Sequence, residues 1–405
     1  MIAYDKTLLN NVYIDEEAIR LKQAGFITTE QYKSISSQLP RLKSQNNIFV
    51  RIGFFILGSM LYSSISGVLS LLWLGICANG LGNAGDRDNP YLFMVYILSM
   101  IGFGAKELLS REMKYFGFGL DDAFILGTIL VSLIGIGLTF EENYAPNFLA
   151  VIIVLAVSSS IAYLRYLNLS LALLACIGIT GSLAYLVFDY LIIGKTILPF
   201  VMLLFSGIAF FISKQKLQNL SSPYYDNGLK LARSFSLVVF YLAGNYYVVR
   251  ELNFSLSEDY TYNSLSPEIP FALFFWAFTF ITPLAYLFSS LKNKDRIMLW
   301  IGFLALCFSF LTFRMYHHVL PPEVTVTIGG LVLFAFTYFA IKKTKHNETG
   351  ITFKADHFTD SDAYLNLQTL VVTSQLGIKP GTKIEESPMK FGGGDYSGGG
   401  ASGSF

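Results

Sequence analysis

The chain has 405 residues, of which 53% are hydrophobic and only 14% are charged. About 25% of the residues of a soluble globular protein are charged, so this composition excludes an ordinary soluble domain. The net charge is +1, from 29 basic and 28 acidic residues, and this excludes the strongly basic field of a nucleic-acid-binding protein. We therefore predict an all-α, polytopic transmembrane helix bundle that contacts the lipid bilayer and has no nucleic-acid partner.

Residues 1–47 form the first predicted domain, and they contain no hydrophobic segment of a signal peptide. Asp15 begins a periodic run that stops at Gly25, and Thr28, with Gln31 three residues later, begins a second run that ends before Pro40. Thr and Gln at this spacing form a helix-capping pair, while glycine and proline end helices. We predict two short helices that are too small to fold alone and that dock on the membrane domain or on a protein partner.

Apolar windows long enough to cross a bilayer recur through residues 48–342, the second predicted domain. Glycine, serine and alanine are frequent in these windows, and such small residues let membrane helices approach closely. We predict a bundle of about ten spans, at 50–75, 90–109, 121–140, 147–165, 168–188, 196–213, 229–249, 270–290, 297–313 and 322–341.

Basic residues divide unequally between the two sides of this bundle. With ten spans, 21 of the 29 Lys and Arg residues fall on the side that holds both termini, 4 fall on the opposite side, and 4 lie farther along the C-terminal tail. Basic residues near span ends are retained in the cytoplasm. We therefore predict a multi-pass protein with both termini cytoplasmic.

The third predicted domain is the polar tail, residues 343–405. One short amphipathic helix is predicted at about 361–376, and the Gly-rich end at 391–405 has no helical or strand period. Phe391, Tyr396 and Phe405 are spaced along this end, where they could anchor a cytoplasmic protein that captures an extended chain. An inert end is the alternative interpretation.

Two segments resemble bacterial membrane proteins. The run from Leu21 to Gln31, with Gly25 between the helices and Thr28 as the cap, precedes the first span and resembles the family grouped as domain of unknown function 2157. The Gly-rich, aromatic-ended tail that starts at Phe391 resembles the C-termini of TPM-domain proteins and of membrane proteins from Bacteroidetes-like bacteria. These resemblances imply a location in the bacterial inner membrane and no particular activity.

Ionisable side chains inside spans are the first candidates for function, because a charge in hydrocarbon is costly unless it is paired. One cluster lies at the end of the second span and comprises Lys106, Glu107, Arg111 and Glu112. Glu107 and Arg111 are one helical turn apart and can pair. We interpret the cluster as interfacial, with long side chains that reach the headgroups, and Asp121 and Asp122 as the acidic first turn of the third span.

Two further polar groups lie in or beside spans. Tyr241 and Asn245 of the seventh span are a turn apart and can face the bundle interior, where Asn bonds a neighbouring helix. A second patch at the outer side combines the end of the ninth span with an acidic loop, and comprises Arg314, His317, His318, Glu141 and Glu142. This patch is either an interfacial belt or a proton-responsive or anion-contacting group.

Motifs of catalysis are missing from the sequence. It contains no nucleophile elbow, phosphate-binding loop or zinc-protease helix. Cys77, Cys176 and Cys307 lie in or beside apolar runs, which fits neither a disulfide framework nor a metal site. We predict no catalytic residue, no metal and no cofactor. The favoured function is that of a non-enzymatic membrane protein whose cytoplasmic ends are interaction elements; a transporter or channel for a small solute, or an enzyme of envelope or lipid metabolism, are the alternatives.

Overall fold

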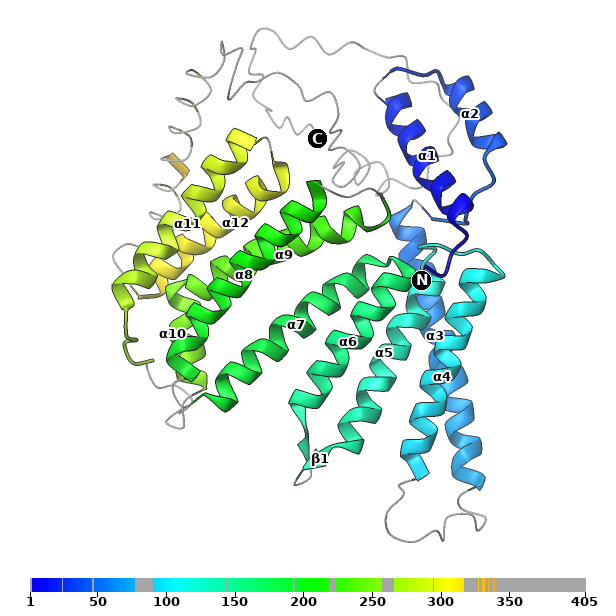
Figure 1. The fold of residues 1–405 in the computed structure, drawn as a ribbon, viewed down its shortest axis with the longest axis horizontal. Coiled ribbons are helices and arrows are strands. Elements are labelled where there is room, and N and C mark those ends of the chain that lie inside the picture. Colours follow the sequence, from blue (N-terminus) through cyan, green and yellow to red (C-terminus); the bar gives the residue numbers. More distant parts are fainter. Residues whose placement is uncertain are drawn as a thin grey trace, which may run out of the picture. The chain divides into compact units, whose positions relative to one another are not determined.

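A computed structural model describes most of the chain through Tyr316 and six residues beyond it. The described residues are 2–23, 25–45, 47–76, 90–142, 145–191, 194–218, 223–256, 266–293, 295–316, 327, 330, 331, 334, 338 and 342. In this part the chain is helical almost throughout (Figure 1), which confirms the predicted all-α class. The exception is a small antiparallel hairpin of β1 (Glu141–Glu142) and β2 (Ala145–Pro146).

Two helices precede the first span, α1 (Lys6–Gln23) and α2 (Thr29–Gln38). The predicted start of α1 at Asp15 is wrong, because Asp5 caps the helix: its carboxylate accepts from the Thr7 and Leu8 N–H groups at 2.7 and 3.2 Å. The Leu8 and Thr7 N–H groups also hold the pKa of Asp5 below its usual range. The capping pair of α2 is confirmed, since Thr28 and Gln31 each accept from the other's backbone N–H.

Eight described helices are long and apolar enough to cross a membrane. They match the first six predicted spans and the eighth and ninth. These helices are α3 (Ile48–Ile76), α4 (Pro90–Arg111), α5 (Leu120–Thr139), α6 (Phe148–Tyr166), α7 (Leu169–Tyr190), α8 (Gly194–Gln218), α11 (Ala272–Asn293) and α12 (Arg296–Tyr316). The tenth predicted span lies mostly outside the described residues, although its described positions, such as Leu331 and Phe334, are helical.

The seventh predicted span is two helices. A short 3-10 turn (Pro223–Tyr225) leads into α9 (Asp226–Gly244), and α10 (Tyr246–Ser255) follows. The prediction of one helix over 229–249 is wrong, because Asn245 adopts an extended backbone and its side-chain oxygen accepts from the Val248 N–H at 3.2 Å. An Asn that caps a new helix in this way competes with continuation of the old one.

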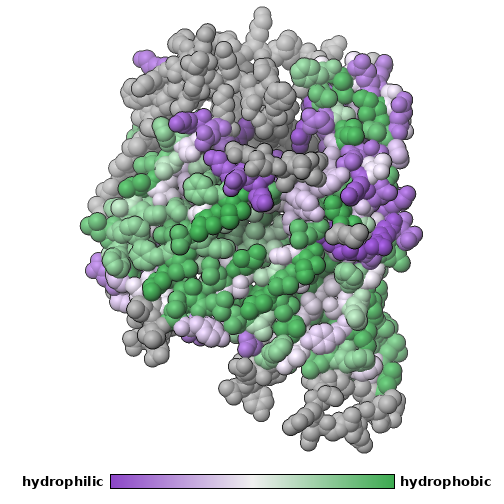
Figure 2. Space-filling model, viewed as in Figure 1, coloured by the Kyte–Doolittle hydropathy of each residue, from purple (hydrophilic) through white to green (hydrophobic). Residues whose placement is uncertain are grey.

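Helices that are consecutive in sequence pack in pairs: α4 with α5, α6 with α7, α8 with α9 and α11 with α12, while α3 lies mainly against α5 (Figure 1). Large apolar side chains point outward from these helices, among them Leu71, Met100 and Leu273, which are 72%, 76% and 84% exposed. Hydrophobic residues cover much of the visible face, and hydrophilic residues are concentrated toward the end of the molecule where α1 and α2 lie (Figure 2). An apolar outer surface of this extent is what a bilayer requires.

Close helix approach depends on glycine where α6 meets α7. A Cβ added at Gly178 would lie 2.6 Å from the Ala156 backbone nitrogen and 2.7 Å from its Cα. These contacts are with backbone, so they cannot be relieved by moving a side chain. The glycine therefore fixes the spacing of the α6–α7 pair, as small residues do in membrane helices.

Gly178→Ala should destabilise the protein by about 1–3 kcal/mol, because it overpacks this contact. Gly67→Ala is the matched control in α3, since nothing lies within 4 Å of an added Cβ there and alanine is the better helix former. Thermal unfolding in detergent would compare the two. Equal melting temperatures would show that α6 and α7 are not in close contact.

Candidate functional site beneath the N-terminal helices

A buried ion pair joins α4 to the first turn of α5. Lys106 Nζ donates to Asp121 Oδ2 at 2.7 Å, and both residues have 0% of their surface exposed. The other oxygen of Asp121 accepts from the Phe118 and Gly119 N–H groups at 3.0 and 3.1 Å. The carboxylate therefore has three donors, which is the condition under which a buried charge is tolerated.

The N-terminal segment closes over this ion pair. Tyr4 is buried, and its hydroxyl oxygen accepts from Lys106 Nζ at 3.4 Å. The Lys106 ammonium also lies 4.9 Å from the ring centroid of Tyr166, at the end of α6. Burial raises the pKa of Tyr4, so Tyr4 stays a neutral hydroxyl at physiological pH. The residues around Lys106 thus replace the water that an ammonium would otherwise bind.

Two further carboxylates surround the pair. Asp122 accepts from the Arg51 guanidinium of α3, at 3.1 Å from Nε and 2.5 Å from Nη2, and from the Asn168 amide at 2.5 Å. Glu107 accepts from Arg165 Nη2 at 2.5 Å and from the Tyr166 hydroxyl at 2.8 Å. These contacts extend the network to five helices, α3 to α7, at one end of the membrane domain.

The position of Lys106 corrects the prediction of an interfacial cluster. Its side chain is enclosed by protein and does not reach toward headgroups. Arg111 does have an exposed side chain, and it pairs with Glu107 one turn earlier, as predicted. The assignment of Asp121 and Asp122 to the first turn of α5 is confirmed.

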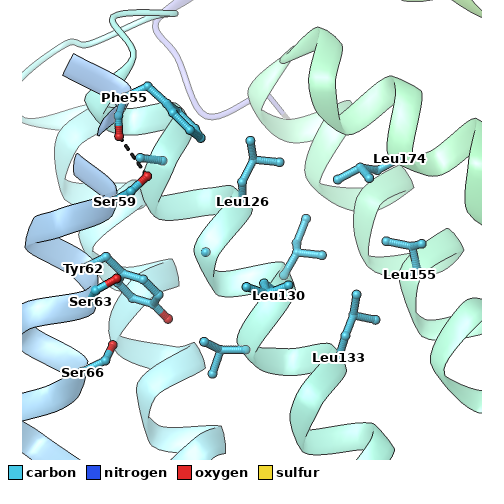
Figure 3. A pocket seen from close by; sticks show the side chains of 14 residues that line it. Phe55, Ser59, Tyr62, Ser63, Ser66, Leu126, Leu130, Leu133, Leu155 and Leu174 are labelled. Atoms are coloured by element: carbon cyan, nitrogen blue, oxygen red, sulfur yellow. Dashed lines mark hydrogen bonds between the residues drawn. The ribbon is translucent and has the colours of Figure 1, made fainter. Parts of the chain in front are cut away.

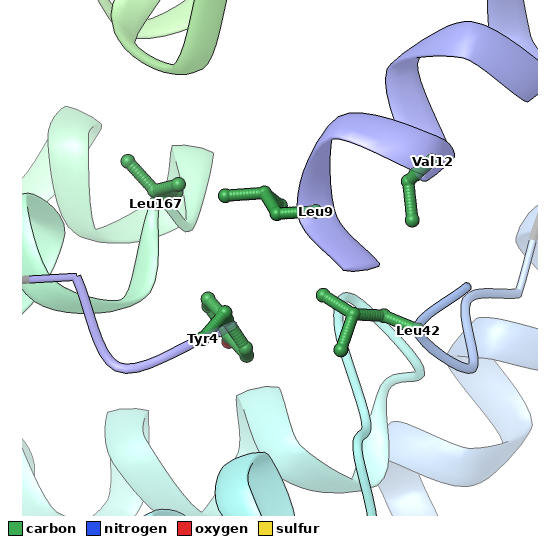
Figure 4. Packing of buried hydrophobic residues seen from close by; sticks show 5 residues of the cluster. All are labelled: Tyr4, Leu9, Val12, Leu42 and Leu167. Atoms are coloured by element: carbon green, nitrogen blue, oxygen red, sulfur yellow. The ribbon is translucent and has the colours of Figure 1, made fainter. Parts of the chain in front are cut away.

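Apolar contacts dock α1 on the same end of the membrane domain. Tyr4, Leu9, Val12, Leu42 and Leu167 form one buried cluster (Figure 4). Leu167 follows α6, and the Ala3 N–H donates to the Arg165 carbonyl at 3.0 Å. Of the two dockings predicted for the N-terminal helices, on the membrane domain or on a partner, the structure shows the first for α1, whereas α2 has no buried residue. We call this end of the membrane domain the hairpin side, and α1 with α2 the N-terminal hairpin.

A second buried polar cluster surrounds the break between α9 and α10. The Asn245 amide donates to the Tyr241 hydroxyl at 3.0 Å and bonds the Thr312 hydroxyl of α12 at 3.2 Å. Tyr241 also lies 2.8 Å from the Ser309 hydroxyl, which donates to the Thr279 carbonyl at 2.7 Å. The expected bond from Asn245 to a neighbouring helix is confirmed. The side chains of this cluster are all uncharged, whereas the network beneath the hairpin contains ion pairs. The cluster comprises Tyr241, Asn245, Thr279, Ser309 and Thr312.

The remaining predicted site residues are not brought together among the described residues. Arg314 lies in the last turn of α12 and is half-buried. Glu141 and Glu142 form β1. His317, His318, Phe391, Tyr396 and Phe405, and the side chains of Glu141 and Glu142, lie outside what the structure describes. Within the described ranges, no three His, Cys, Asp or Glu side chains are grouped so that they could hold a metal ion.

The apolar helices and their exposed hydrophobic surface define a multi-pass integral membrane protein. No family model, curated protein or solved structure matches the chain. The candidate function therefore depends on the geometry of the two polar clusters and of the surfaces beside them.

Sequence reasoning missed the central ion pair because Lys106 and Asp121 were assigned to separate features. A signal was present: a basic residue at the end of one span and an acidic residue at the start of the next lie on the same side of the membrane. Consecutive spans joined by a short loop usually pack as neighbours, so opposite charges there can meet. The contacts of Arg51 and Arg165 carried no comparable signal, because their partners are far away in sequence.

Lys106→Met should destabilise the protein by about 3–5 kcal/mol, because it leaves Asp121 as an unpaired buried charge. The double variant Lys106→Met with Asp121→Leu should recover most of that loss, since it removes both charges. Thermal unfolding in detergent provides the measurement. If the double variant lost as much unfolding free energy as the two single variants lose together, the result would contradict a direct pair.

Proposed function

We propose that this protein is a non-enzymatic integral membrane protein whose N-terminal hairpin is a cytoplasmic interaction element, coupled to the membrane domain through Tyr4. The observation that carries this proposal is the contact of Tyr4 with the buried Lys106–Asp121 pair. A partner that displaced the hairpin would expose the buried Lys106–Asp121 pair to water. Its binding would therefore change the stability of α4 and α5.

One face of the hairpin is firmly attached. Asn11 donates to the Pro40 carbonyl at 2.7 Å, and Asp15 pairs with Arg41, so α1 is bonded to the segment that leads into the first span. The Tyr224 hydroxyl, just before α9, donates to the Asn10 side chain at 2.5 Å. The hairpin is thus bonded both to the segment that leads into α3 and to the turn that precedes α9.

Other parts of the hairpin surface are exposed. No residue of α2 is buried, and Ile14, Leu21 and Phe26 are 50%, 39% and 73% exposed. Ile14 and Leu21 are seven residues apart on α1 and share a helix face. An exposed apolar group on an otherwise polar element fits a protein partner with a complementary apolar patch.

Phe26→Asp should abolish capture of such a partner, because it replaces the most exposed of these three apolar side chains with a charge. Ser37→Asp is the matched control, since it adds the same charge to an exposed position of α2. Chemical crosslinking in native membranes followed by affinity purification of the full-length protein provides the measurement. We expect the recovered amount of at least one captured protein to fall about tenfold with Phe26→Asp and to stay unchanged with Ser37→Asp. Identical captured sets for both variants would contradict the proposal.

The C-terminal end is the second proposed interaction element. Phe391, Tyr396 and Phe405 lie outside the described residues, so this part of the proposal rests on their spacing in a Gly-rich segment. Placement of both ends in the cytoplasm of a bacterial cell rests on the unequal distribution of basic residues and on the sequence resemblances. Deletion of residues 391–405 in the capture experiment separates the two elements.

A transporter is the alternative favoured by one observation, the break between α9 and α10. Discontinuous membrane helices form substrate and ion sites in many transporters, and here the break adjoins buried hydroxyl and amide groups. Prolines inside α8 and α11, Pro199 and Pro283, lie in neighbouring helices. The cluster is fully packed in this structure, with Ser309 and Asn245 0% exposed, so transport would require it to open to water.

Thiol labelling tests for that opening. The substitution Ser309→Cys is introduced into a variant that lacks Cys77, Cys176 and Cys307, and the protein is treated with a membrane-impermeant maleimide. Ser37→Cys in the same background is the accessible control. The interaction proposal predicts that Ser309→Cys reacts at least about a hundredfold more slowly than the control, as a packed core position does. Labelling at comparable rates would support a water-filled path and favour the transporter.

A further inference from the structure

A lateral groove opens between α3 and the helices that follow α4. Its volume is about 530 Å³. The floor is formed by α5, with Leu126, Leu130 and Leu133 pointing into the space, and Leu155 of α6 and Leu174 of α7 lie on one side (Figure 3). The opposite wall is α3, which presents Phe55, Ser59, Tyr62, Ser63 and Ser66. All of these residues belong to candidate membrane spans.

The α3 wall is less polar than its sequence indicates. Ser59 donates to the Phe55 carbonyl at 2.9 Å, and the Tyr62 hydroxyl donates to the Leu98 carbonyl at 3.1 Å. These two hydroxyl protons are therefore occupied within the protein. Ser63 and Ser66 also line the groove, and the buried Ser66 Oγ has no hydrogen-bond partner among the described residues, while the rest of the lining is apolar. A polar solute would find few donors here, whereas a hydrocarbon chain would bury apolar surface on three sides.

The length of the groove matches one leaflet of a bilayer. From Phe55 to Ser66 the α3 wall rises about 16 Å, at 1.5 Å per residue. Half of a hydrocarbon core of about 30 Å is about 15 Å. This length suits an acyl chain that lies along α3 within one leaflet.

Basic residues stand at the hairpin-side end of the groove. Arg51 lies one helical turn before Phe55, and its side chain remains 43% exposed while it pairs with Asp122. Lys43 and Lys114 are exposed and are joined by a backbone bond, since the Lys43 N–H donates to the Lys114 carbonyl at 2.8 Å. We call Lys43, Arg51 and Lys114 the basic rim.

Aromatic stacking ties the basic rim together. The Lys43 ammonium lies 5.6 Å from the ring centroid of Tyr115, which stacks on Phe118 at 4.5 Å. Phe118 in turn lies 4.5 Å from Phe54 of α3, next to the groove residue Phe55. The basic rim and the entrance of the groove are therefore held by one set of contacts. Tyrosine is enriched at the headgroup level of a bilayer, which suits Tyr115 at this place.

We propose that this groove binds an anionic glycerophospholipid, with one acyl chain between α3 and α5 and the phosphate at the basic rim. The length of the groove and its apolar lining match the acyl region of one leaflet, and the positive charge of the basic rim complements the headgroup. Because Lys43 belongs to the segment that follows the N-terminal hairpin, bound lipid also contacts the part of the chain that holds the hairpin in place.

Photocrosslinking with lipid probes tests this proposal on the full-length protein. The purified protein is reconstituted in phosphatidylcholine vesicles that contain about 2% of a phosphatidylglycerol or a phosphatidylcholine with a photoreactive acyl chain, and labelled peptides are identified by mass spectrometry. We expect the phosphatidylglycerol probe to label residues 55–66 and 123–133 at least about fivefold more than other lipid-facing segments, and about fivefold more than the phosphatidylcholine probe does.

Two pairs of variants distinguish binding of the acyl chain in the groove from binding of the phosphate at the basic rim. Leu130→Trp fills the groove and should remove the preferential labelling, whereas Leu138→Trp, an exposed α5 position outside the groove, should leave it unchanged. Lys43→Ala with Lys114→Ala should reduce the preference for phosphatidylglycerol at least about fivefold, since each lysine near an anionic headgroup contributes about that factor. Lys33→Ala with Lys6→Ala is the control for lost charge.

Several outcomes would overturn the proposal. Labelling spread over all lipid-facing helices would show that the groove holds only exchanging bilayer lipid. Equal labelling by the two probes, or a preference that survives loss of Lys43 and Lys114, would remove the headgroup site. Persistent labelling of residues 123–133 in Leu130→Trp would show that the acyl chain lies elsewhere. A thermal unfolding measurement on each variant confirms that the protein remains folded.

Discussion

The buried pair of Lys106 and Asp121 is the interaction on which the arrangement of the first five spans depends. A charge without a partner in this position would be costly. Both residues, the backbone donors of Asp121 and the hydroxyl of the buried Tyr4 therefore stabilise the pair together. The surrounding contacts of Asp122 and Glu107 then fix α3 and α6 around the pair. The position of the N-terminal hairpin is therefore part of the solvation of a membrane charge, and this gives the hairpin a physical means to influence the membrane domain.

The two parts of the membrane domain are held by different chemistry. Several ion pairs gather on the hairpin side of α3 to α7. Helices α9 to α12 share one ion pair, between Arg233 and Asp295 at 2.6 Å, and are otherwise joined by hydroxyl and amide groups near Asn245 and by rings such as Tyr246 and Trp276, stacked at 4.4 Å. The proposed lipid groove and the proposed partner surface both belong to the first part. They meet at Lys43, whose backbone bonds Lys114 and which follows Leu42 of the hairpin cluster. Lipid binding and partner binding would thus act on the same short segment.

The sequence predicted the elements that depend on local composition. Twenty-residue apolar windows marked the spans, and Thr28 with Gln31 marked the start of α2, because hydropathy and capping are properties of neighbouring residues. The start of α1 was misplaced because the acidic run at Asp15 outweighed the single capping residue Asp5. The break at Asn245 was missed because apolar residues continue on both sides of it. The ion pairs of Arg51 and Arg165 could not be predicted, since they depend on how distant helices face one another.

Hydrogen–deuterium exchange on the full-length protein in lipid nanodiscs tests most directly whether the hairpin and the buried ion pair form one unit. The comparison is between the native protein and Tyr4→Ala, which removes the buried side chain whose hydroxyl contacts Lys106. If the account is right, exchange in the variant increases both in α1 and at the adjoining ends of α4 and α5, around residues 106–111 and 118–123. Faster exchange confined to α1 would show that the membrane domain is indifferent to the hairpin and would contradict the coupling.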